Sequence, residues 1–594
     1  MALNALKAEG VRWDLGELYS GPADPRIDAD LADAKHRAQQ FADRYRGRVA
    51  GLKGAELADV LAEYEALSEL LYRPSFYANL LFAAATQDQK AQQLVGHTRE
   101  AATQTANSLI FFELELIALD DGQFSGVMSV PQMAPYAHYL EVLRRFKSHT
   151  LSEKEEQILN QKNLTGRSAF EQLYDELCGS LRFNVRIEGE ERELTDSEVM
   201  ALLRDPSREL REHALSVFLE THGRQALVIT SVFNNAFLDH KLDCDLRHYD
   251  DIVMPTHLSN DIAPETVEAM MQAVERHYGL AQEYFRLKAQ LIGVDKLKTS
   301  DLYAPVAAST EKIPFDEARS LILTAFGKFS GRFSGMADEF FTRRWIDAEV
   351  RAGKRGGAFC AALTPNHHPY VLCSYTGTGR DVSTIAHELG HAIHYQLSRC
   401  QRWVNHHAPL VLAETASVFA EITLTRHLLS ATESTAVRRG ILCDLLDDIY
   451  GTVYRQTALT RFEMSAHQKR HEGQLSTDDL CALWLQEQSK LFGDSVEMIP
   501  AYRWGWSYIS HFIHSRFYCY SYSFGELLTL ALFQRYLDEG DSFVPGYIQL
   551  LESGGSERPD RALSKLGIDI NQSEFWNRGF RVIEGFLDDL KAAI

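Results

Sequence analysis

The sequence lacks a framework of paired cysteines. Its eight cysteines lie far apart among 594 residues, and no two of them form a C-x-x-C pair. This spacing is typical of reduced thiols in a cytosol and does not suit a disulfide-stabilised domain or a zinc site made of thiolates. Any metal site in this chain is therefore expected to use histidine and carboxylate ligands.

Long apolar segments are also missing, and basic charge is scarce. No run of about 18 uncharged apolar residues occurs, and the N-terminal segment "MALNALKAEGVRWDLGELYS" has no basic stretch followed by an apolar one. Lys and Arg total 61 against 82 Asp and Glu, so the formal net charge is −21. Such a charge repels nucleic-acid phosphates and anionic membrane surfaces. We expect a cytoplasmic protein that binds neither nucleic acid nor membrane.

Periodic apolar residues predict a mainly α-helical fold. Apolar side chains recur at intervals of three and four, with polar faces between them, in the segments 53–72, 152–163 and 205–223. Two short exceptions indicate β structure. Alternation around a glycine predicts a β-hairpin at 181–195, and β-branched and aromatic residues predict a strand at 368–376. The expected class is therefore mainly α with a small β element.

The segment "TIAHELGHAIHYQL", residues 384–397, predicts a helix that carries a two-histidine metal clamp. At about 100° per residue, His387 and His391 lie about 40° apart around the helix and about 6 Å apart along it, so both imidazoles can reach one ion. Glu388 follows the first histidine, and its carboxylate can act as a base on water that the metal activates. The order H-E-x-x-H is the signature of zinc peptidases.

Two further expectations concern the ends of this helix. Asp381 or Ser383 is expected as the N-cap, because either side chain can accept a hydrogen bond from a backbone N–H of the first turn. His394 falls near the face of the other histidines, but its axial rise from His387 is about 10.5 Å. It is therefore expected to support the site or to pack rather than to bind the same ion.

A catalytic zinc needs three protein ligands and an open position. A glycine turn that brings in a third histidine is excluded, because His394 and Leu397 occupy the positions where that glycine and histidine would stand. We expect Glu414 as the third ligand. It lies 23 residues after His391, which is enough chain to finish one helix, turn and run back antiparallel.

Other polar residues near Glu414 compete with it or support it. Glu421, two turns farther along the same helical pattern, is expected to orient a ligand histidine or to pair with Arg426. Acidic residues in an otherwise apolar helix are costly unless they are satisfied, which argues against a simple core helix. His406 and His407 remain rivals for the third ligand position, but the polar loop around them favours solvated side chains.

These segments together resemble the M3 metallopeptidases, and within them the oligoendopeptidase F branch. The matching stretches are "DVSTIAHELGHAIH", "LAETASVFAE", "HPYVLCSYTGT" and "RLKAQLIGVDKLKTSDLYAP". The resemblance places the zinc ligands at His387, His391 and Glu414, with one zinc ion per chain. It places the catalytic base at Glu388. It also implies a largely helical, two-lobed body around a deep channel that admits short unstructured peptides and excludes folded proteins.

The predicted strand and hairpin bear on substrate binding and on domain organisation. An exposed edge at 368–376, near the zinc, could pair with an extended substrate backbone, and the alternative is a buried core strand. After the hairpin, "TDSEVM" starts a new helix near residue 195. We therefore expect an N-terminal helical domain at 1–195 and a catalytic zinc peptidase domain at 196–594.

The segment "SYISHFIHSRFYCYSYSFG", residues 507–525, is dense in aromatic residues and contains two histidines. Buried tyrosine hydroxyls need partners, so several tyrosines close together are awkward for packing alone. M3 enzymes take donors to the oxyanion of the transition state from a segment like this one. By this resemblance the catalytic histidine falls on His511 and the tyrosine on Tyr520. The alternates are His514, Tyr518 and Tyr522.

The function expected from these observations is zinc-dependent hydrolysis of oligopeptides by an endopeptidase. A helical H-E-x-x-H metallocarboxypeptidase is the alternative, but it needs a cationic pocket for the terminal carboxylate of its substrate, which no sequence feature marks. A peptide-binding protein without catalysis is a second alternative, which would leave Glu388 unexplained. Cleavage of a peptide blocked at both ends separates endopeptidase from carboxypeptidase.

Overall fold

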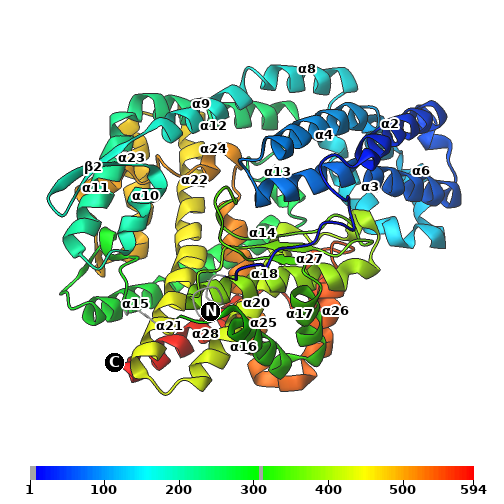
Figure 1. Ribbon diagram of the computed structural model, residues 1–594. Coiled ribbons are helices and arrows are strands. Elements are labelled where there is room, and N and C mark those ends of the chain that lie inside the picture. Colours follow the sequence, from blue (N-terminus) through cyan, green and yellow to red (C-terminus); the bar gives the residue numbers. More distant parts are fainter. Residues whose placement is uncertain (1–7, 307–311) are drawn as a thin grey trace. The chain divides into compact units, whose positions relative to one another are not determined.

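The computed structural model describes residues 8–306 and 312–594, and its elements are mainly α-helices (Figure 1). The three segments with the clearest helical period are confirmed as α3 (Gly54–Ala84), α8 (Glu153–Asn163) and α11 (Arg208–Arg224). Among the described helices, none combines the length and the apolar character that a membrane span requires.

The described chain forms two compact units that are each discontinuous in sequence. The first unit contains the described residues of the ranges 1–147, 310–430 and 535–568, and the second those of 148–309, 431–534 and 569–594. The boundary expected near residue 195 falls inside the second unit. The reason is that the hairpin before it packs against α11, which follows it in the chain, so no break in packing occurs there.

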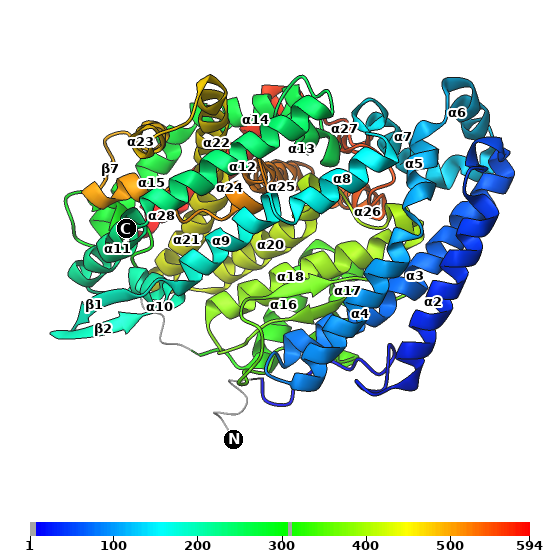
Figure 2. The ribbon, with the colours of Figure 1, turned by 90° about the horizontal axis from the view of Figure 1, so that it is seen from above.

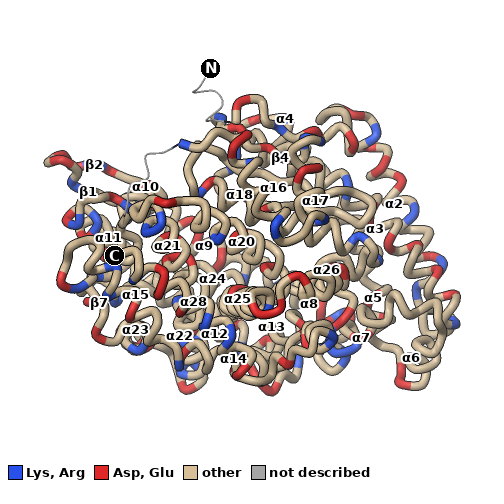
Figure 3. Tube along the Cα trace, turned by 90° about the horizontal axis from the view of Figure 1, so that it is seen from below, with Lys and Arg blue, Asp and Glu red and all other residues tan. Residues whose placement is uncertain are grey.

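Helices from the N-terminal part of the chain build one end of the first unit. Helices α2 (Pro25–Tyr45) and α4 (Gln89–Asn107) both pack on α3, and Figure 2 shows the three helices together. Buried residues such as Phe41, Leu61 and Phe112 form the core between these helices and α5. The exposed side of α2 carries both acidic and basic residues (Figure 3). The remaining helices of this part are α5 (Ile110–Ala118), α6 (Asp121–Met128) and α7 (Ala137–Arg145).

A three-stranded sheet in the first unit has the order β4-β6-β5. Strand β6 (Tyr370–Leu372) pairs in parallel with β4 (Ile346–Asp347) and antiparallel with β5 (Phe359–Ala361), with Cys360 opposite Val371. All three residues of β6 are buried. The expectation of an exposed edge strand at 368–376 is therefore wrong, because β6 is the central strand. The edge next to it is β5, which sequence reasoning did not find.

The helix with the H-E-x-x-H motif, α18 (Gly379–Leu397), begins five residues before the predicted start. Its N-cap is Thr378, whose hydroxyl accepts a hydrogen bond from the Asp381 backbone N–H at 3.1 Å. The Asp381 carboxylate in turn accepts from the Thr378 N–H at 3.0 Å. Asp381 therefore completes a capping box as the third helical residue, and the expectation of Asp381 or Ser383 as N-cap is corrected.

Two helices cover α18 from the same unit, and a helix break follows it. α16 (Phe315–Phe329) and α17 (Gly331–Thr342) pack on each other, and both contact α18. After α18 the chain forms α19 (Leu410–Ala413) and α20 (Thr415–Ala431). Glu414 lies at the break between these two helices rather than within one helix. The first unit also contains α26 (Val544–Glu552) and α27 (Pro559–Ser564).

A glycine allows α18 and α20 to come into backbone contact. A Cβ atom added to Gly390 would lie 2.5 Å from the carbonyl oxygen of Ala416 and 2.5 Å from the Cα atom of Ser417. Real Cβ atoms do not approach backbone atoms this closely, so only glycine permits this helix spacing. Gly390 directly precedes His391, and Ala416 lies two residues after Glu414, so this contact determines how near the two side chains come.

The second unit contains the predicted β-hairpin, which is confirmed. Strands β1 (Phe183–Ile187) and β2 (Glu190–Leu194) pair antiparallel across a turn at Glu188 and Gly189, which both have positive φ. Two such residues are typical of the tight turns that suit a hairpin.

The other elements of the second unit are mostly helices. They are α9 (Arg167–Ser180), α10 (Asp196–Ala201), α12 (Ala226–Leu246), α13 (Met254–Ser259), α14 (Pro264–Arg276), α15 (Tyr278–Leu291), β3 (Leu297–Lys298), α21 (Thr435–Ile449), α22 (Arg455–Glu472), α23 (Thr477–Phe492), β7 (Val496–Glu497), α24 (His511–His514), α25 (Cys519–Glu539) and α28 (Ser573–Ala593).

Gly390→Ala is expected to separate α18 from α20 and to weaken metal binding by at least about 10-fold, because the third candidate ligand moves with α20. The matched control is Gly96→Ala in α4, where no atom lies within 4 Å of the added Cβ. That change should be neutral or stabilise by about 0.5–1 kcal/mol. Competition with a chromogenic zinc chelator measures the affinity, and thermal melting measures stability. Wild-type zinc affinity in Gly390→Ala would contradict the role given to this contact.

Candidate metal centre and active site

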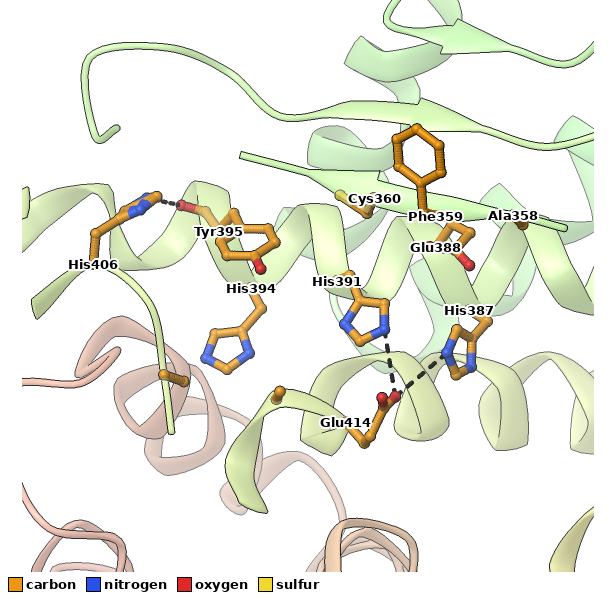
Figure 4. A pocket seen from close by; sticks show the side chains of 12 residues that line it. Ala358, Phe359, Cys360, His387, Glu388, His391, His394, Tyr395, His406 and Glu414 are labelled. Atoms are coloured by element: carbon orange, nitrogen blue, oxygen red, sulfur yellow. Dashed lines mark hydrogen bonds and ion pairs between the residues drawn. The ribbon is translucent and has the colours of Figure 1, made fainter. Parts of the chain in front are cut away.

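Three predicted ligands come together in the first unit. The Nε2 atoms of His387 and His391 each lie 3.4 Å from Oε2 of Glu414. The ligand atoms of these three residues all lie within 4.8 Å of one another. Figure 4 shows both imidazole rings pointing from α18 toward the Glu414 carboxylate, which projects from the break between α19 and α20.

The spacing of these atoms fits a zinc ion. In a tetrahedral zinc site with bonds of about 2.1 Å, neighbouring ligand atoms stand about 3.4 Å apart. Both distances to Glu414 have this value. Two imidazole nitrogens and one carboxylate are also the donor types of many catalytic zinc sites, which keep a fourth position for water or substrate. The residues present therefore suit zinc.

Two more side chains hold the candidate ligands in place. Oε2 of Glu421 lies 3.2 Å from Nδ1 of His387, as expected for a carboxylate that orients a ligand histidine. If Nδ1 carries the proton, Nε2 keeps its lone pair for a metal. The hydroxyl of Ser417 donates a hydrogen bond to Oε2 of Glu414 at 2.7 Å. Sequence reasoning missed Ser417, although its position three residues after Glu414 allows this contact at a helix start.

The electrostatics of the site favour charged carboxylates next to the histidines. Burial by itself raises the pKa of Glu414, but its hydrogen bonds with His387 and His391 outweigh burial and hold this pKa well below its usual value. The carboxylate is therefore ionised near neutral pH, as a zinc ligand must be.

Glu388 lies beside this group without belonging to it. Its side chain is 7% exposed and is next to β5, whose Cys360 backbone hydrogen-bonds to it (Figure 4). Burial raises the pKa of the Glu388 carboxyl above its usual value. A carboxylate in such a place takes up a proton more readily than an exposed one, which suits a general base.

The other histidines near the site have different surroundings. His394 is buried, and burial lowers its pKa to about 3, so its imidazole is neutral. His406 is also buried, with Nε2 3.2 Å from the carbonyl oxygen of Tyr395, whereas His407 is exposed. The expectation of a solvated side chain therefore fails for His406, since its loop folds back onto α18. Among the described residues, neither His406 nor His407 joins the three-residue metal group.

A cavity of about 320 Å³ is bordered by His387, His391 and Glu414, which we call the metal group. Its wall includes Phe359 and Cys360 of β5, Tyr395 of α18 and His406 of the following loop. The hydroxyl of Tyr395 has no hydrogen-bond partner within the described chain, and Figure 4 shows its ring on the wall between His391 and His406. The cavity thus combines an apolar strand, a free hydroxyl and the candidate ligands.

The aromatic segment 507–525 lies in the second unit and contains both buried and accessible tyrosines. Tyr520 is fully buried, and its hydroxyl accepts a hydrogen bond from Nδ2 of Asn260 at 2.7 Å and lies 3.2 Å from Nδ1 of His257. Its hydroxyl is therefore already engaged in the core of this unit. This position favours the alternates over Tyr520 as a donor to substrate.

His511 and two of the alternates form a partly exposed cluster. The His511 ring stacks on Tyr518 with ring centroids 5.7 Å apart and meets Tyr522 edge-on at 5.8 Å. Its Nε2 atom is 3.4 Å from the Tyr522 hydroxyl. His514, the other histidine of the segment, instead lies 2.8 Å from Oδ1 of Asp175. The structure thus brings the His511 ring together with Tyr518 and Tyr522, whereas the His514 ring pairs with Asp175.

Comparisons with known proteins identify relatives over most of the chain. The model of peptidase family M3 matches residues 201–582, and the oligopeptidase F model matches residues 115–183. Oligopeptidase PepF of Bacillus subtilis is 25% identical over 592 residues, which cover 99% of this chain and 87% of that protein. A crystal structure from Chlamydophila abortus has a TM-score of 0.86 at 25% identity and covers 98% of both chains. Oligoendopeptidase-F of Enterococcus faecium has a TM-score of 0.73 at 22% identity, with coverage of 96% of this chain and 98% of that one.

Replacing the two carboxylates of the site should have unequal effects on zinc binding. Glu414→Ala removes a candidate ligand and is expected to abolish tight binding. Glu421→Ala removes only the partner of His387 and should weaken binding by about 10 to 100-fold. Glu433→Ala, at an exposed glutamate, is the control and should bind zinc normally. Zinc content after dialysis and competition with a chelator measure all three. A larger loss for Glu421→Ala than for Glu414→Ala would mean that the wrong glutamate is assigned as ligand.

Proposed function

The chain belongs to peptidase family M3, and we propose that the two histidines of its H-E-x-x-H motif and Glu414 hold one zinc ion per chain. It is a zinc metalloendopeptidase that hydrolyses oligopeptides. The observation that carries the assignment of ligands is the 3.4 Å spacing of both histidine nitrogens from one oxygen of Glu414.

In the proposed site, zinc would activate the carbonyl and water, and the side chains around it would hold the metal and position its ligands. When bound, zinc polarises the scissile carbonyl and makes a nearby water molecule more acidic. Glu414 contributes one negative charge against two neutral imidazoles, so the site keeps a net positive charge for this purpose. Glu421 and Ser417 keep His387 and Glu414 oriented, so that the ligand atoms stay in place during turnover.

Glu388 is the proposed general base. Its carboxylate accepts the proton of the attacking water and passes it to the amine that leaves. The carboxylate is close to the metal group but outside it, and its burial raises its affinity for a proton. The neighbouring H-bond from the backbone of Cys360 holds the side chain against β5.

Strand β5 is the proposed binding edge for the substrate backbone. It is an edge strand, and residues Ala358, Phe359 and Cys360 line the cavity with the metal group. An extended peptide added to such an edge gains main-chain hydrogen bonds with little dependence on its side chains. This mode suits short unstructured peptides as substrates.

His511 is proposed to assist the transition state together with Tyr518 or Tyr522. These rings are accessible and contact one another, whereas the Tyr520 hydroxyl is engaged with Asn260. A donor that strengthens its hydrogen bond as the oxyanion forms contributes several kcal/mol. The assignment of Tyr520 as the donor, made from the sequence, stays a prediction.

We also propose that the protein acts in the cytoplasm and without nucleic acid as a partner. All eight cysteines are free in the structure, which agrees with a reducing compartment. The net charge of −21 opposes binding to a phosphate backbone.

Glu388→Gln is expected to keep zinc and to lose about 10² to 10⁴-fold in kcat, because the amide cannot accept the proton. The substrate is a fluorogenic oligopeptide blocked at both ends, so that only an internal cut gives a signal. A chelator should abolish wild-type cleavage, and added zinc should restore it. Loss of zinc from Glu388→Gln would assign this residue to the metal instead. No cleavage of any blocked peptide by the zinc-loaded wild type would refute the proposed endopeptidase.

Tyr522→Phe is expected to lower kcat and kcat/KM together by about 10 to 1,000-fold, with zinc content unchanged. Tyr520→Phe should instead remove one of the two acceptors of the Asn260 amide, which keeps the Ser521 hydroxyl, and destabilise the fold by about 0.5–1.5 kcal/mol, with kcat near normal. Kinetics at saturating peptide and urea unfolding separate the two effects. If Tyr520→Phe alone lowers kcat while stability is unchanged, the choice of Tyr520 from the sequence is right.

A further inference from the structure

A second cavity in the first unit, of about 570 Å³, is lined by three tyrosines and one tryptophan among apolar residues, and contains one carboxylate. Tyr64 and Tyr72 come from α3, Tyr139 from α7 and Trp403 from the loop after α18. The carboxylate belongs to Glu113 in the first turn of α5. We call this space the aromatic cavity. Apolar side chains of leucine, isoleucine, valine and alanine, together with Ser68 and His407, complete its wall.

The Glu113 carboxylate has hydrogen bonds but no cation beside it. One oxygen, Oε1, accepts from the hydroxyl of Tyr139 at 2.9 Å and from that of Tyr64 at 3.5 Å. No lysine or arginine lines the cavity, and within the described ranges Glu113 forms no ion pair. Burial and the nearby Glu113 charge both raise the pKa of Tyr72, so its hydroxyl also lies in the field of this carboxylate. The Glu113 carboxylate, hydrogen-bonded to two tyrosines, therefore faces a half-buried space whose lining contains one imidazole, that of His407, and no lysine or arginine.

The aromatic cavity and the metal cavity share a wall. In the loop after α18, Trp403, Val404 and His407 line the aromatic cavity, whereas His406 and Ala408 line the metal cavity. Tyr395 of the metal cavity contacts both of these histidine rings, with centroid distances of 5.7 Å to His406 and 5.2 Å to His407. The two cavities are thus separated by the thickness of one loop, and all of these residues belong to one unit.

The chemistry of the aromatic cavity selects a cation. An apolar guest would leave the Glu113 carboxylate poorly solvated and unpaired, which is costly, and an anion would be repelled. A guanidinium or ammonium group can pair with the carboxylate. The cation is also attracted to the faces of aromatic rings, and the apolar stem of an arginine or lysine side chain packs against them. The net charge of −21 also attracts basic peptides toward the protein.

We propose that the aromatic cavity binds an arginine or lysine side chain of the peptide substrate, a few residues away from the bond that is cut. An extended peptide advances about 3.3 Å per residue, so a side chain two to four residues from the scissile bond can cross the distance of one loop. This inference rests on the proposed function, since it assigns a specificity site to the same peptidase.

The test uses doubly blocked fluorogenic peptides that differ at one position only. Each carries arginine or its neutral isostere citrulline, placed in turn two, three or four residues to either side of the cut. At one of these positions, wild type should show a kcat/KM at least about 10-fold higher for arginine. Glu113→Gln should bring this ratio close to one. Glu113→Lys should reverse the charge preference, so that a peptide with glutamate at this position is cleaved with a higher kcat/KM than the arginine peptide.

The control Glu100→Gln changes the same charge at an exposed residue of α4 and should keep the wild-type ratio. This control shows whether the loss of one negative charge anywhere on the protein is enough to abolish the preference for arginine. Equal rates for arginine and citrulline at every position in wild type would overturn the inference, even if no Glu113 variant folds. A wild-type ratio that survives in folded, zinc-loaded Glu113→Gln would overturn it as well.

A binding experiment separates this inference from the proposed function. Agmatine, which carries a guanidinium group without a peptide bond, is titrated into zinc-loaded Glu388→Gln and into the same protein with Glu113→Gln, by calorimetry. Binding that disappears with Glu113→Gln supports the cation site, even if no peptide is cleaved. Peptide cleavage without arginine preference or agmatine binding would leave the endopeptidase standing and reject the cation site.

Discussion

The active site depends on the backbone contact between α18 and α20 at Gly390. A Cβ atom at this position would lie 2.5 Å from the Ala416 carbonyl oxygen, so any other residue would hold the helices apart. The contact lies one residue from His391 and two residues from Glu414. A shift of the helix axes would move Glu414 away from the two histidines and remove the 3.4 Å spacing that suits zinc. One glycine in an otherwise ordinary helix thus sets the geometry of the centre.

Charge balance explains why so many acidic groups cluster in a largely apolar region. Glu414, Glu421 and Glu388 all lie within reach of the two histidines, and each has a different surrounding. Glu414 is held ionised by the imidazoles, Glu421 contacts the far nitrogen of His387, and Glu388 is buried against β5. Burial of a carboxylate is costly unless a partner compensates it, so the same residue type acquires distinct roles from its neighbours.

The proposed substrate contacts come from parts of the first unit that are far apart in sequence. Strand β5 and the loop at 403–408 both border the metal cavity, and the loop also borders the aromatic cavity. Side chains of an extended peptide on the β5 edge would therefore face both the metal cavity and the loop at 403–408. Backbone pairing on an edge strand favours no particular sequence, so a cation site one loop away adds a preference that the edge cannot provide.

Much of the fold class and of the metal group could be read from the sequence, because both depend on short-range spacing. The helical period is a local property, and so is the separation of His387 from His391 along α18. Glu414 could be chosen because the sequence excludes a third histidine brought in by a glycine turn, and because the 23 residues after His391 are enough to turn and run back along α18. The same reasoning found Glu421 as the partner of His387, since it lies two turns farther along the helix that follows Glu414.

Only the tertiary structure decided which strand is the edge, where the units divide and which tyrosines are accessible. Composition predicts a strand at 368–376 but does not decide whether it is an edge; β4 and β5 pair with both sides of β6, and neither has a strong pattern of its own. Tyr518, Tyr520 and Tyr522 are alike in sequence, and their difference arises from Asn260 and His257, which are more than 250 positions earlier in the chain. Glu113 lies in a helical segment like many others, and its cavity forms only when five separate parts of the chain meet. Local patterns determine helices and the ligands along them, whereas exposure and pairing depend on contacts between residues that are distant in sequence.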